Sequence, residues 1–262
     1  MMSLARNIPE ANKSTHEGKW EKSKFTGTEL YSKTLGLIGC GNIGSIVANR
    51  ALGLKMHVKV YDPFLTHEKA KEIGVEKIEI DELFKISDFI SLHVPLTNST
   101  KEIINAKSIT KMKRGVKIIN CARGGLVNET DLVNAINKGQ VSGAAFDVFV
   151  EEPAHKNVLF GMPEIVATPH LGASTSEAQE NVAIQIAEQM SNYLINGAVT
   201  NALNLPAVSS EDAPKLKPYM KLAEQIGRLA GQITDTSICL LYTSPSPRDL
   251  STSRMPSSAW KK

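Results

Sequence analysis

The 262-residue sequence is poor in cysteine, poor in aromatic residues and free of long apolar runs. Its three cysteines are too few for a disulfide framework, so we expect a reducing compartment, the cytoplasm. No stretch approaches the roughly 18 uninterrupted apolar residues of a membrane-spanning helix, and residues 1–20 contain no apolar core like that of a signal peptide. With 42% apolar and 22% charged residues, the composition is typical of a globular protein without a membrane partner.

The sequence also lacks an excess of charge outside its last residues. The formal net charge is +3, and residues 239–262 alone carry four basic residues against one acidic residue. The preceding residues are therefore neutral as a whole. Because nucleic-acid-binding proteins present clustered basic side chains, we expect no nucleic-acid partner.

Residues 239–262 differ in character from the rest of the chain. They are rich in Ser and Pro and lack hydrophobic periodicity, which predicts a disordered tail. The string CLLYTSPSPRD also resembles the translation of a sequencing adaptor, so we expect this tail to have no function. Because the first residues read as a helix entered midway, we interpret the chain as a fragment. The expected parts are a main domain at 1–173, a helix and linker at 174–205, the start of a truncated C-terminal region at 206–238, and the tail.

Between residues 25 and 200, short apolar runs alternate with helical patterns. The near-continuous apolar character of the runs indicates strands that are buried on both faces. Such alternation predicts an α/β fold, a doubly wound parallel sheet with helices on both sides. The expected strands are 34–40, 57–63, 88–95, 116–122, 143–149 and 164–170. The expected helices are 42–53, 66–74, 106–115, 128–139 and 174–197, with a further helical element at 213–234.

A glycine-rich string, GCGNIG at 39–44, joins the first strand to the first helix and fits the pattern G-x-G-x-x-G. Gly39 permits the tight turn, Gly41 lets a pyrophosphate approach the backbone, and Gly44 lets the helix pack closely on the strand. The helix N-terminus then offers free N–H groups to the phosphates. Asp62, 18 residues beyond Gly44, can accept hydrogen bonds from ribose hydroxyls and repel a 2′-phosphate. The sequence therefore predicts a Rossmann-type domain that binds NAD rather than NADP.

Three polar side chains follow the ends of later strands, where ligands bind in open α/β sheets. Arg123 lies in NCARGGLVN, Glu152 in FVEEPAH and His170 in TPHLGAST. Oxidation of a secondary alcohol needs a hydride acceptor, a base and a cation that orients the substrate; NAD, His170 and Arg123 can supply them. A carboxylate beside His170 would fix its tautomer. Glu152 is the candidate, and spacing alone does not exclude Glu151.

Plainer interpretations of these residues remain open. A lone arginine is usually a surface cation, and a lone histidine is usually structural. His93, in LHVPL, is a rival base, but it lies inside an expected strand and its side chain can point into the sheet. The other histidines show no spacing typical of a metal site. Cys40 and Cys121 lie in apolar strands, so we interpret both as small buried hydrophobes.

Six motifs, in order, resemble the D-isomer-specific 2-hydroxyacid dehydrogenases: GLIGCGNIG, YDP, LHVPLT, NCARGGLVNE, FDVF with EEP, and TPHLGAST. The resemblance covers residues 4 to about 238. It implies that Arg123, Glu152 rather than Glu151, and His170 are catalytic, and that residues 1–173 bind NAD. The expected cofactor-binding residues are Gly39, Gly41, Asn42, Ile43, Gly44, Asp62, Val94, Pro95, Cys121, Ala122, Arg123, Asp147, His170, Gly172 and Ala173.

The continuation past residue 208 resembles the longer members of this family, which act on 3-phosphoglycerate. The resemblance thus implies that the full-length protein oxidises 3-phospho-D-glycerate to 3-phosphohydroxypyruvate with NAD, the first step of L-serine synthesis. Two alternatives stay open: another 2-hydroxyacid dehydrogenase, such as a glyoxylate or hydroxypyruvate reductase, and a non-catalytic NAD-sensing scaffold. In the family the larger part of a split substrate domain precedes the NAD-binding domain. We expect most of that domain to be missing here, so that the chain binds NAD with little turnover. We also expect a homo-oligomer formed through the NAD-binding domain.

Overall fold

The structure is a computed structural model, and it describes residues 1–202 and 213–233. It divides into two compact units, Met1–Ser174 and Thr175–Lys262, which we describe separately. The expectations for residues 203–212 and 234–262 lie outside the described residues. They concern the end of the linker, parts of the truncated C-terminal region and the whole tail.

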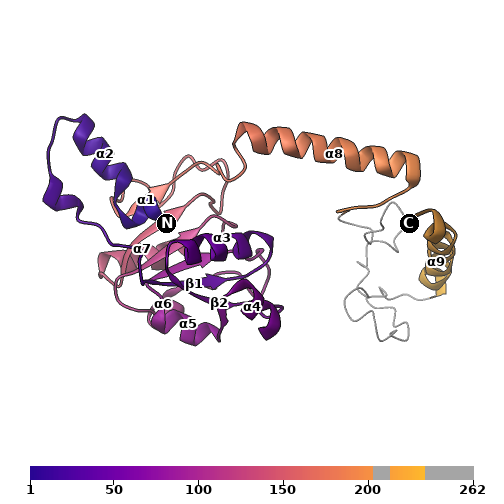
Figure 1. Cartoon of the computed structure of the whole chain (residues 1–262), viewed down its shortest axis with the longest axis horizontal. Helices are drawn as coiled ribbons and strands as arrows, with labels where there is room; N and C mark the ends of the chain where they lie inside the picture. Colours follow the sequence, from indigo (N-terminus) through magenta and orange to yellow (C-terminus); the bar gives the residue numbers. More distant parts are fainter. Residues whose placement is uncertain (203–212, 234–262) are drawn as a thin grey trace. The chain divides into compact units, whose positions relative to one another are not determined.

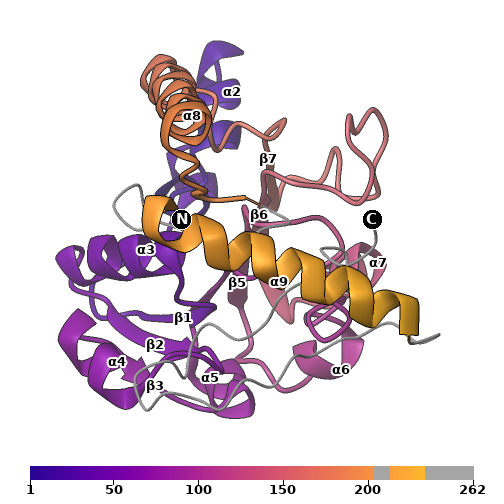
Figure 2. The same ribbon diagram turned by 90° about the vertical axis from the view of Figure 1, so that its right-hand side faces the viewer.

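The first unit contains a seven-stranded sheet in which every pair of neighbouring strands is parallel. The strand order is β3-β2-β1-β4-β5-β6-β7. Figure 2 labels β3, β2, β1, β5, β6 and β7 along this order. The strands are β1 (Thr34–Ile38), β2 (His57–Tyr61), β3 (Glu76–Lys77), β4 (Phe89–Leu92), β5 (Val116–Asn120), β6 (Val141–Phe146) and β7 (Ile165–Ala167). The order reverses between β1 and β4, and this arrangement confirms the predicted doubly wound fold.

Helices cover both faces of this sheet, as the alternating patterns predict (Figure 1). The helices of the unit are α1 (Met2–Ala5), α2 (Ile8–His16), α3 (Asn42–Gly53), α4 (His67–Ile73), α5 (Ile80–Ile86), α6 (Ala106–Ile109) and α7 (Glu129–Asn137), with a 3-10 turn, η1 (Lys22–Phe25). One hydrophobic core joins α1, α3 and α4 to the sheet, and another joins α5, α6 and α7 to the opposite face. Alternation along the strands explains the division: Leu37 belongs to the first core, and its neighbour Ile38 to the second.

The structure differs from the sequence-based expectations in the lengths and number of elements. β3 was not predicted, because a two-residue strand is too short for a clear periodic pattern, and the seven-residue helix α5 was also missed. The helix expected at 106–115 ends at Ile109, since the amides of Lys111 and Met112 bond three residues back instead of four. The strand expected at 164–170 is reduced to three residues in β7. The N-terminal helical pattern forms two helices, broken at Asn7, whose φ is +52°.

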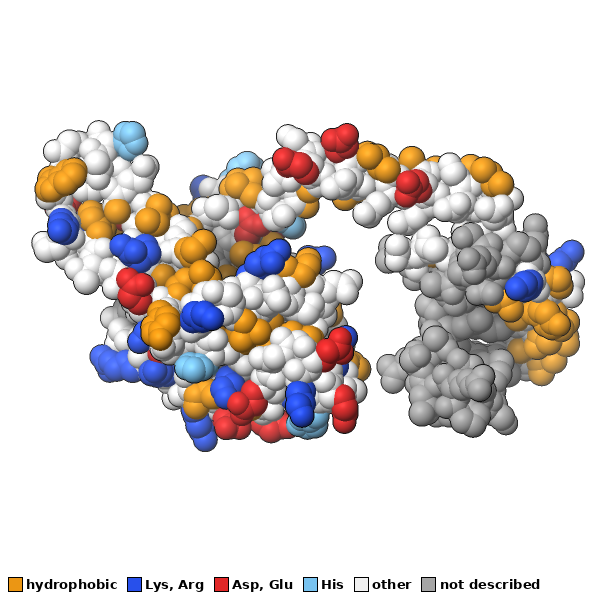
Figure 3. All heavy atoms as spheres, viewed as in Figure 1, with side chains coloured by type: hydrophobic (Ala, Val, Ile, Leu, Met, Phe, Trp, Pro, Cys, Tyr) orange, Lys and Arg blue, Asp and Glu red, His pale blue; other side chains and the backbone are white. Residues whose placement is uncertain are grey.

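The second unit contains α8 (Ser176–Asn196) and α9 (Ala213–Ile233). The Thr175 side chain accepts a hydrogen bond from Ala178 N and caps the start of α8, and Gly197, with φ +70°, ends the helix. No residue of α8 is buried, and its apolar side chains lie on the surface (Figure 3). Among the described residues, no helix has the length and apolar character needed to cross a membrane.

Candidate active site

The glycine turn after β1 has the geometry of an anion-binding helix start. Gly39 has a φ of +95°, which L side chains rarely adopt. A Cβ on Gly44 would collide with the Gly39 carbonyl oxygen, so a glycine is needed where α3 approaches the turn. A Cβ on Gly41 would meet nothing within 4 Å, which leaves open space above the backbone. The α3 N-cap has no side-chain cap, so the first amides of α3 are free to bind phosphate oxygens.

Asp62 lies directly after β2 and is tied to the same turn. Its Oδ2 accepts a hydrogen bond from Cys40 N at 2.7 Å, and its Oδ1 accepts one from Phe64 N at 2.8 Å. These two bonds fix the carboxylate beside the glycine turn, where the adenosine ribose of a dinucleotide is expected. Free amides, open space at Gly41 and a fixed carboxylate together fit NAD.

The residues after β4 lie on the other side of the turn. Val94 packs against Gly39, because a Cβ on that glycine would come within 2.7 Å of Val94 Cγ1. His93 falls just beyond β4, not inside it, and its Nε2 lies 2.9 Å from Ser91 Oγ. Burial lowers the pKa of His93 to about 4. His93 is therefore neutral near pH 7 and is a weaker base there than an ordinary histidine.

The loop after β5 carries Arg123 on the surface of the unit. Its guanidinium Nη1 donates a hydrogen bond to the Ala122 carbonyl at 2.6 Å, so the side chain folds onto its own loop. The Gly124 backbone lies against the Phe149 carbonyl, where no Cβ would fit. Cys121, on the same loop, is exposed, unlike Cys40. The expectation that both cysteines are buried is therefore wrong for Cys121, which follows the last buried residue of β5.

Glu152 and His170 form a close pair although they are 18 residues apart in the sequence. Glu152 Oε2 lies 2.6 Å from His170 Nδ1, and its Oε1 accepts a hydrogen bond from Phe149 N at 2.9 Å. The Phe149 amide and then the His170 hydrogen bond lower the pKa of Glu152 below its ordinary value of 4.5. An ionised carboxylate can only accept, so Nδ1 carries the proton, and in the neutral form of the ring Nε2 keeps a lone pair. Glu151 makes no hydrogen bond within the described part of the chain.

Asp147, which directly follows β6, holds the loop that carries His170. Its side chain is buried, and its Oδ1 accepts hydrogen bonds from Thr168 Oγ1 at 2.5 Å and Leu171 N at 2.7 Å. Its Oδ2 accepts one from Gly172 N at 2.9 Å. His170 has a φ of +54°, an unfavourable conformation for a residue with a side chain. The Asp147 contacts on both sides of it hold the backbone in that conformation.

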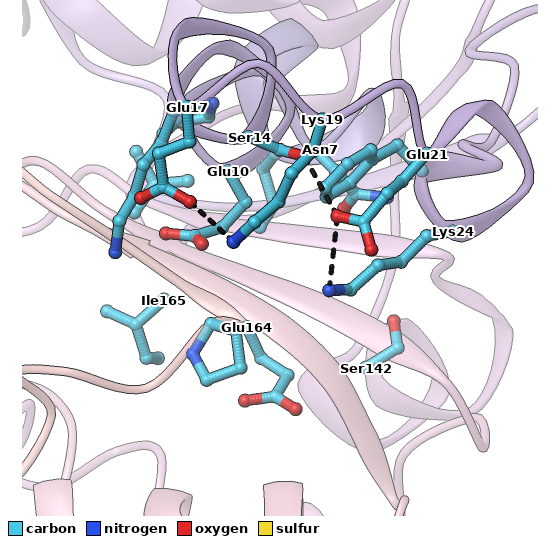
Figure 4. Close-up of a pocket in the computed structure, with 16 residues that line it drawn as sticks. Asn7, Glu10, Ser14, Glu17, Lys19, Glu21, Lys24, Ser142, Glu164 and Ile165 are labelled. Atoms are coloured by element: carbon cyan, nitrogen blue, oxygen red, sulfur yellow. Dashed lines mark hydrogen bonds and ion pairs between the residues drawn. The ribbon is translucent and has the colours of Figure 1, made fainter.

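Two cavities lie in the first unit, at opposite edges of the sheet. The Glu152–His170 pair lines a cavity of about 600 Å³ whose walls are largely apolar, with Phe149, Phe160 and Ala167 among them. A cavity of about 590 Å³ lies between the α2–η1 segment and the amino ends of β6 and β7 (Figure 4). Among the charged residues that line it, Lys19 pairs with Glu17 at 2.7 Å and Lys24 with Glu21 at 3.6 Å, and none of the predicted site residues line it.

The structure thus places the predicted residues at the carboxyl ends of parallel strands, on one edge of the sheet. The glycine turn and Asp62 are in contact, as are Glu152 and His170, and Asp147 with Gly172. No hydrogen bond or ion pair joins Arg123 to His170 in the described part of the chain. Sequence reasoning missed Asn120 and Thr168, whose polar side chains hold the loops of Arg123 and His170. The sequence signal that could have identified them is a polar residue at the end of an apolar run, where each strand ends.

Comparison with known proteins matches residues 1–172 to the family described as D-isomer specific 2-hydroxyacid dehydrogenase, NAD binding domain. The D-3-phosphoglycerate dehydrogenase of Synechocystis sp. is 48% identical over 233 residues, which are 89% of this chain and 42% of that protein. The chain therefore spans less than half the length of this relative.

Solved structures of other family members have the same fold. A glyoxylate reductase from Paecilomyes thermophila is 33% identical with a TM-score of 0.71, over 76% of this chain and 61% of that one. A D-lactate dehydrogenase from Aquifex aeolicus, complexed with NAD and lactic acid, is 31% identical with a TM-score of 0.67, over 75% and 63%. With the glycine turn, the fixed Asp62 and the family match all in one unit, this chain belongs to the D-isomer specific 2-hydroxyacid dehydrogenase family and carries its NAD-binding domain.

Proposed function

We propose that the whole protein is an NAD-dependent dehydrogenase that oxidises 3-phospho-D-glycerate to 3-phosphohydroxypyruvate, the first step of L-serine synthesis, in the cytoplasm. The observation that carries this proposal is the Glu152–His170 pair, with Nδ1 and Oε2 2.6 Å apart at the same sheet edge as the glycine turn. The 48% identity to the Synechocystis D-3-phosphoglycerate dehydrogenase supports this choice of substrate.

The chain's own residues divide the work of such a reaction. Bound NAD supplies the hydride acceptor for C2 of the hydroxy acid. The unprotonated Nε2 of His170 accepts the hydroxyl proton, and ionised Glu152 keeps Nδ1 protonated and stabilises the resulting imidazolium. The Arg123 side chain is exposed, and within the described residues its guanidinium donates to the Ala122 carbonyl of its own loop. From there it can swing onto a substrate carboxylate and form two parallel hydrogen bonds.

A second substrate class has its own support. The glyoxylate reductase from Paecilomyes thermophila shares this fold at 33% identity. The catalytic residues proposed here act on the 2-hydroxy acid group that both substrates share, so the described residues favour neither. The two substrates differ in the phosphorylated third carbon of 3-phosphoglycerate, which glyoxylate and its reduced form lack, and a substrate panel separates them.

The test uses the protein from the complete reading frame that contains this chain, assayed with NAD and a panel of 2-hydroxy acids and with NADH and their 2-keto acids. We expect the highest kcat/KM for 3-phosphoglycerate and 3-phosphohydroxypyruvate. His170→Ala should lower kcat by about 10²–10⁴-fold, because it removes the general base. Highest activity on glyoxylate would transfer the proposal to that substrate, and a loss below tenfold in His170→Ala would remove His170 from the proton-transfer role.

A further inference from the structure

Asn120 is the last residue of β5 and is almost completely buried, with 1% of its surface exposed. A buried amide in an apolar strand is costly unless its polar atoms are hydrogen bonded. Both of them are bonded, and both bonds go to the loop that follows. The side-chain Oδ1 accepts from Ala122 N at 3.1 Å, and the side-chain Nδ2 donates to the Arg123 carbonyl at 2.9 Å.

These two bonds hold the backbone on either side of the Arg123 side chain. The Ala122 carbonyl lies between these two bonded groups, and it accepts a hydrogen bond from the Arg123 guanidinium at 2.6 Å. The Asn120 backbone carbonyl also accepts a hydrogen bond from Asp147 N at 3.0 Å. Asn120 therefore links the Arg123 loop to the residue whose carboxylate holds the His170 loop.

We propose that Asn120 is a positioning residue for Arg123. The side-chain amide of Asn120 fixes the backbone of Ala122 and Arg123, so that the Arg123 guanidinium starts from one defined position at the carboxyl ends of the strands. The substrate-orienting role of Arg123 itself rests on the proposed function. Because the Asn120 side chain is buried and both of its polar atoms bond the following loop, its proposed role is exerted through that loop.

The test compares two variants of the 262-residue chain with a matched control. Asn120→Ala removes both bonds. Asn120→Asp keeps the acceptor for Ala122 N, and it regains a donor to the Arg123 carbonyl only when its carboxyl is protonated. Ser87→Ala is the control, because Ser87 is also fully buried and donates to the Leu83 carbonyl at 2.6 Å, before the amino end of β4. Amide hydrogen exchange, followed by NMR, measures the order of the loop after β5. Titration with NADH measures the dissociation constant of the cofactor.

In Asn120→Ala we expect roughly tenfold faster exchange of the Ala122 amide, because its hydrogen bond is lost. We expect NADH binding to weaken by roughly tenfold in the same variant, and no change in either quantity in Ser87→Ala. In Asn120→Asp, the protection of the amides of residues 122–125, corrected for the intrinsic pH dependence of exchange, should increase as the pH falls through the pKa of the new carboxyl, and it should change less in the parent chain.

Unchanged exchange at Ala122 in Asn120→Ala, or pH-independent loop order in Asn120→Asp, would overturn the proposal. The two proposals fail in different ways. A parent chain that does not bind NADH contradicts the proposed function, while the exchange measurements still decide the role of Asn120.

Discussion

His170 is held from two directions, by its side chain and by its backbone. Glu152 binds Nδ1 of the ring, while the Asp147 carboxylate binds the amides of Leu171 and Gly172 directly after it. The left-handed φ of +54° at His170 costs free energy, of the order of 1–3 kcal/mol for such conformations. The three hydrogen bonds that the Asp147 carboxylate accepts from the residues around His170 offset this cost. The arrangement preorganises the ring nitrogen before any substrate binds.

At the residue scale, the Glu152 hydrogen bonds predict a pH dependence of stability. The pKa of Glu152 is lowered in the folded chain, mainly by the Phe149 amide and then by His170. A depressed carboxyl pKa stabilises the fold above the unfolded-state value, here about 4.5, and that stabilisation is lost as the pH falls through the folded pKa. Glu152→Gln should therefore lower Tm at pH 6–8 and have a shrinking effect below about pH 4.5.

The size of this effect is small, because 35% of the Glu152 side chain is exposed and solvent screens its charge. Thermal unfolding followed by circular dichroism across pH measures it. Glu151→Gln is the control, since Glu151 is a neighbour of the same charge without a hydrogen bond in the described structure. Equal Tm changes in the two variants at neutral pH would show that the Glu152 contacts do not stabilise the fold.

At the element scale, α3 contains two glycines in opposite surroundings. Gly44 packs against the turn after β1, and a Cβ there would collide with the Gly39 carbonyl oxygen and approach His93 Cβ at 3.5 Å. Gly53, at the other end of the helix, would meet nothing within 4 Å. The first glycine is needed for the close contact of helix and strand, whereas the second has no such neighbour.

The same substitution in one helix should therefore have opposite effects. Gly44→Ala should lower the free energy of unfolding by about 1–3 kcal/mol, because the added methyl group overpacks a backbone contact. Gly53→Ala should raise it by up to about 1 kcal/mol, because alanine loses less backbone entropy in a helix. Urea unfolding of the two variants and the parent measures both values. A stable, NAD-binding Gly44→Ala variant would contradict the tight packing of α3 on the turn.

At the scale of the whole molecule, both large hydrophobic cores and all seven strands lie within Met1–Ser174. In the second unit, no residue of α8 is buried, and the remaining small cluster consists of Ala198 with Met220 packed against it. The first unit therefore contains the contacts that a cooperative fold requires, together with every predicted site residue.

We predict that residues 1–174 fold alone and bind NAD. At a free NAD concentration 100 times the dissociation constant, binding should stabilise this piece by about 2.7 kcal/mol, and the 262-residue chain by the same amount. NADP at the same concentration should stabilise both chains less than NAD does, because the Asp62 carboxylate repels a 2′-phosphate. Chemical unfolding with each nucleotide measures these shifts. A piece 1–174 that is unfolded, or that responds equally to both nucleotides, would disagree with this prediction.

The sequence predicted the doubly wound sheet because its signals are local. A strand, a glycine turn and a helix follow one another at Leu35–Gly53, so the turn after β1 needed no knowledge of distant residues. The same holds for the α4 start, where Thr66 accepts from Lys69 N. The shortest strand was not predicted because its signal is not local. Glu76–Lys77 forms a strand only because it pairs with β2.

The amino-acid sequence by itself determined the alternation of strands and helices, the NAD-binding turn and the candidates Arg123, Glu152 and His170, whose catalytic roles stay predictions. Only the tertiary structure decided which glutamate meets His170, because the path of residues 149–152 brings Glu152, not Glu151, to the ring. It also decided that Cys121 is exposed and that Asn120 holds the Arg123 loop. Burial and hydrogen bonding depend on what neighbouring strands bring together, and a linear pattern does not contain that information.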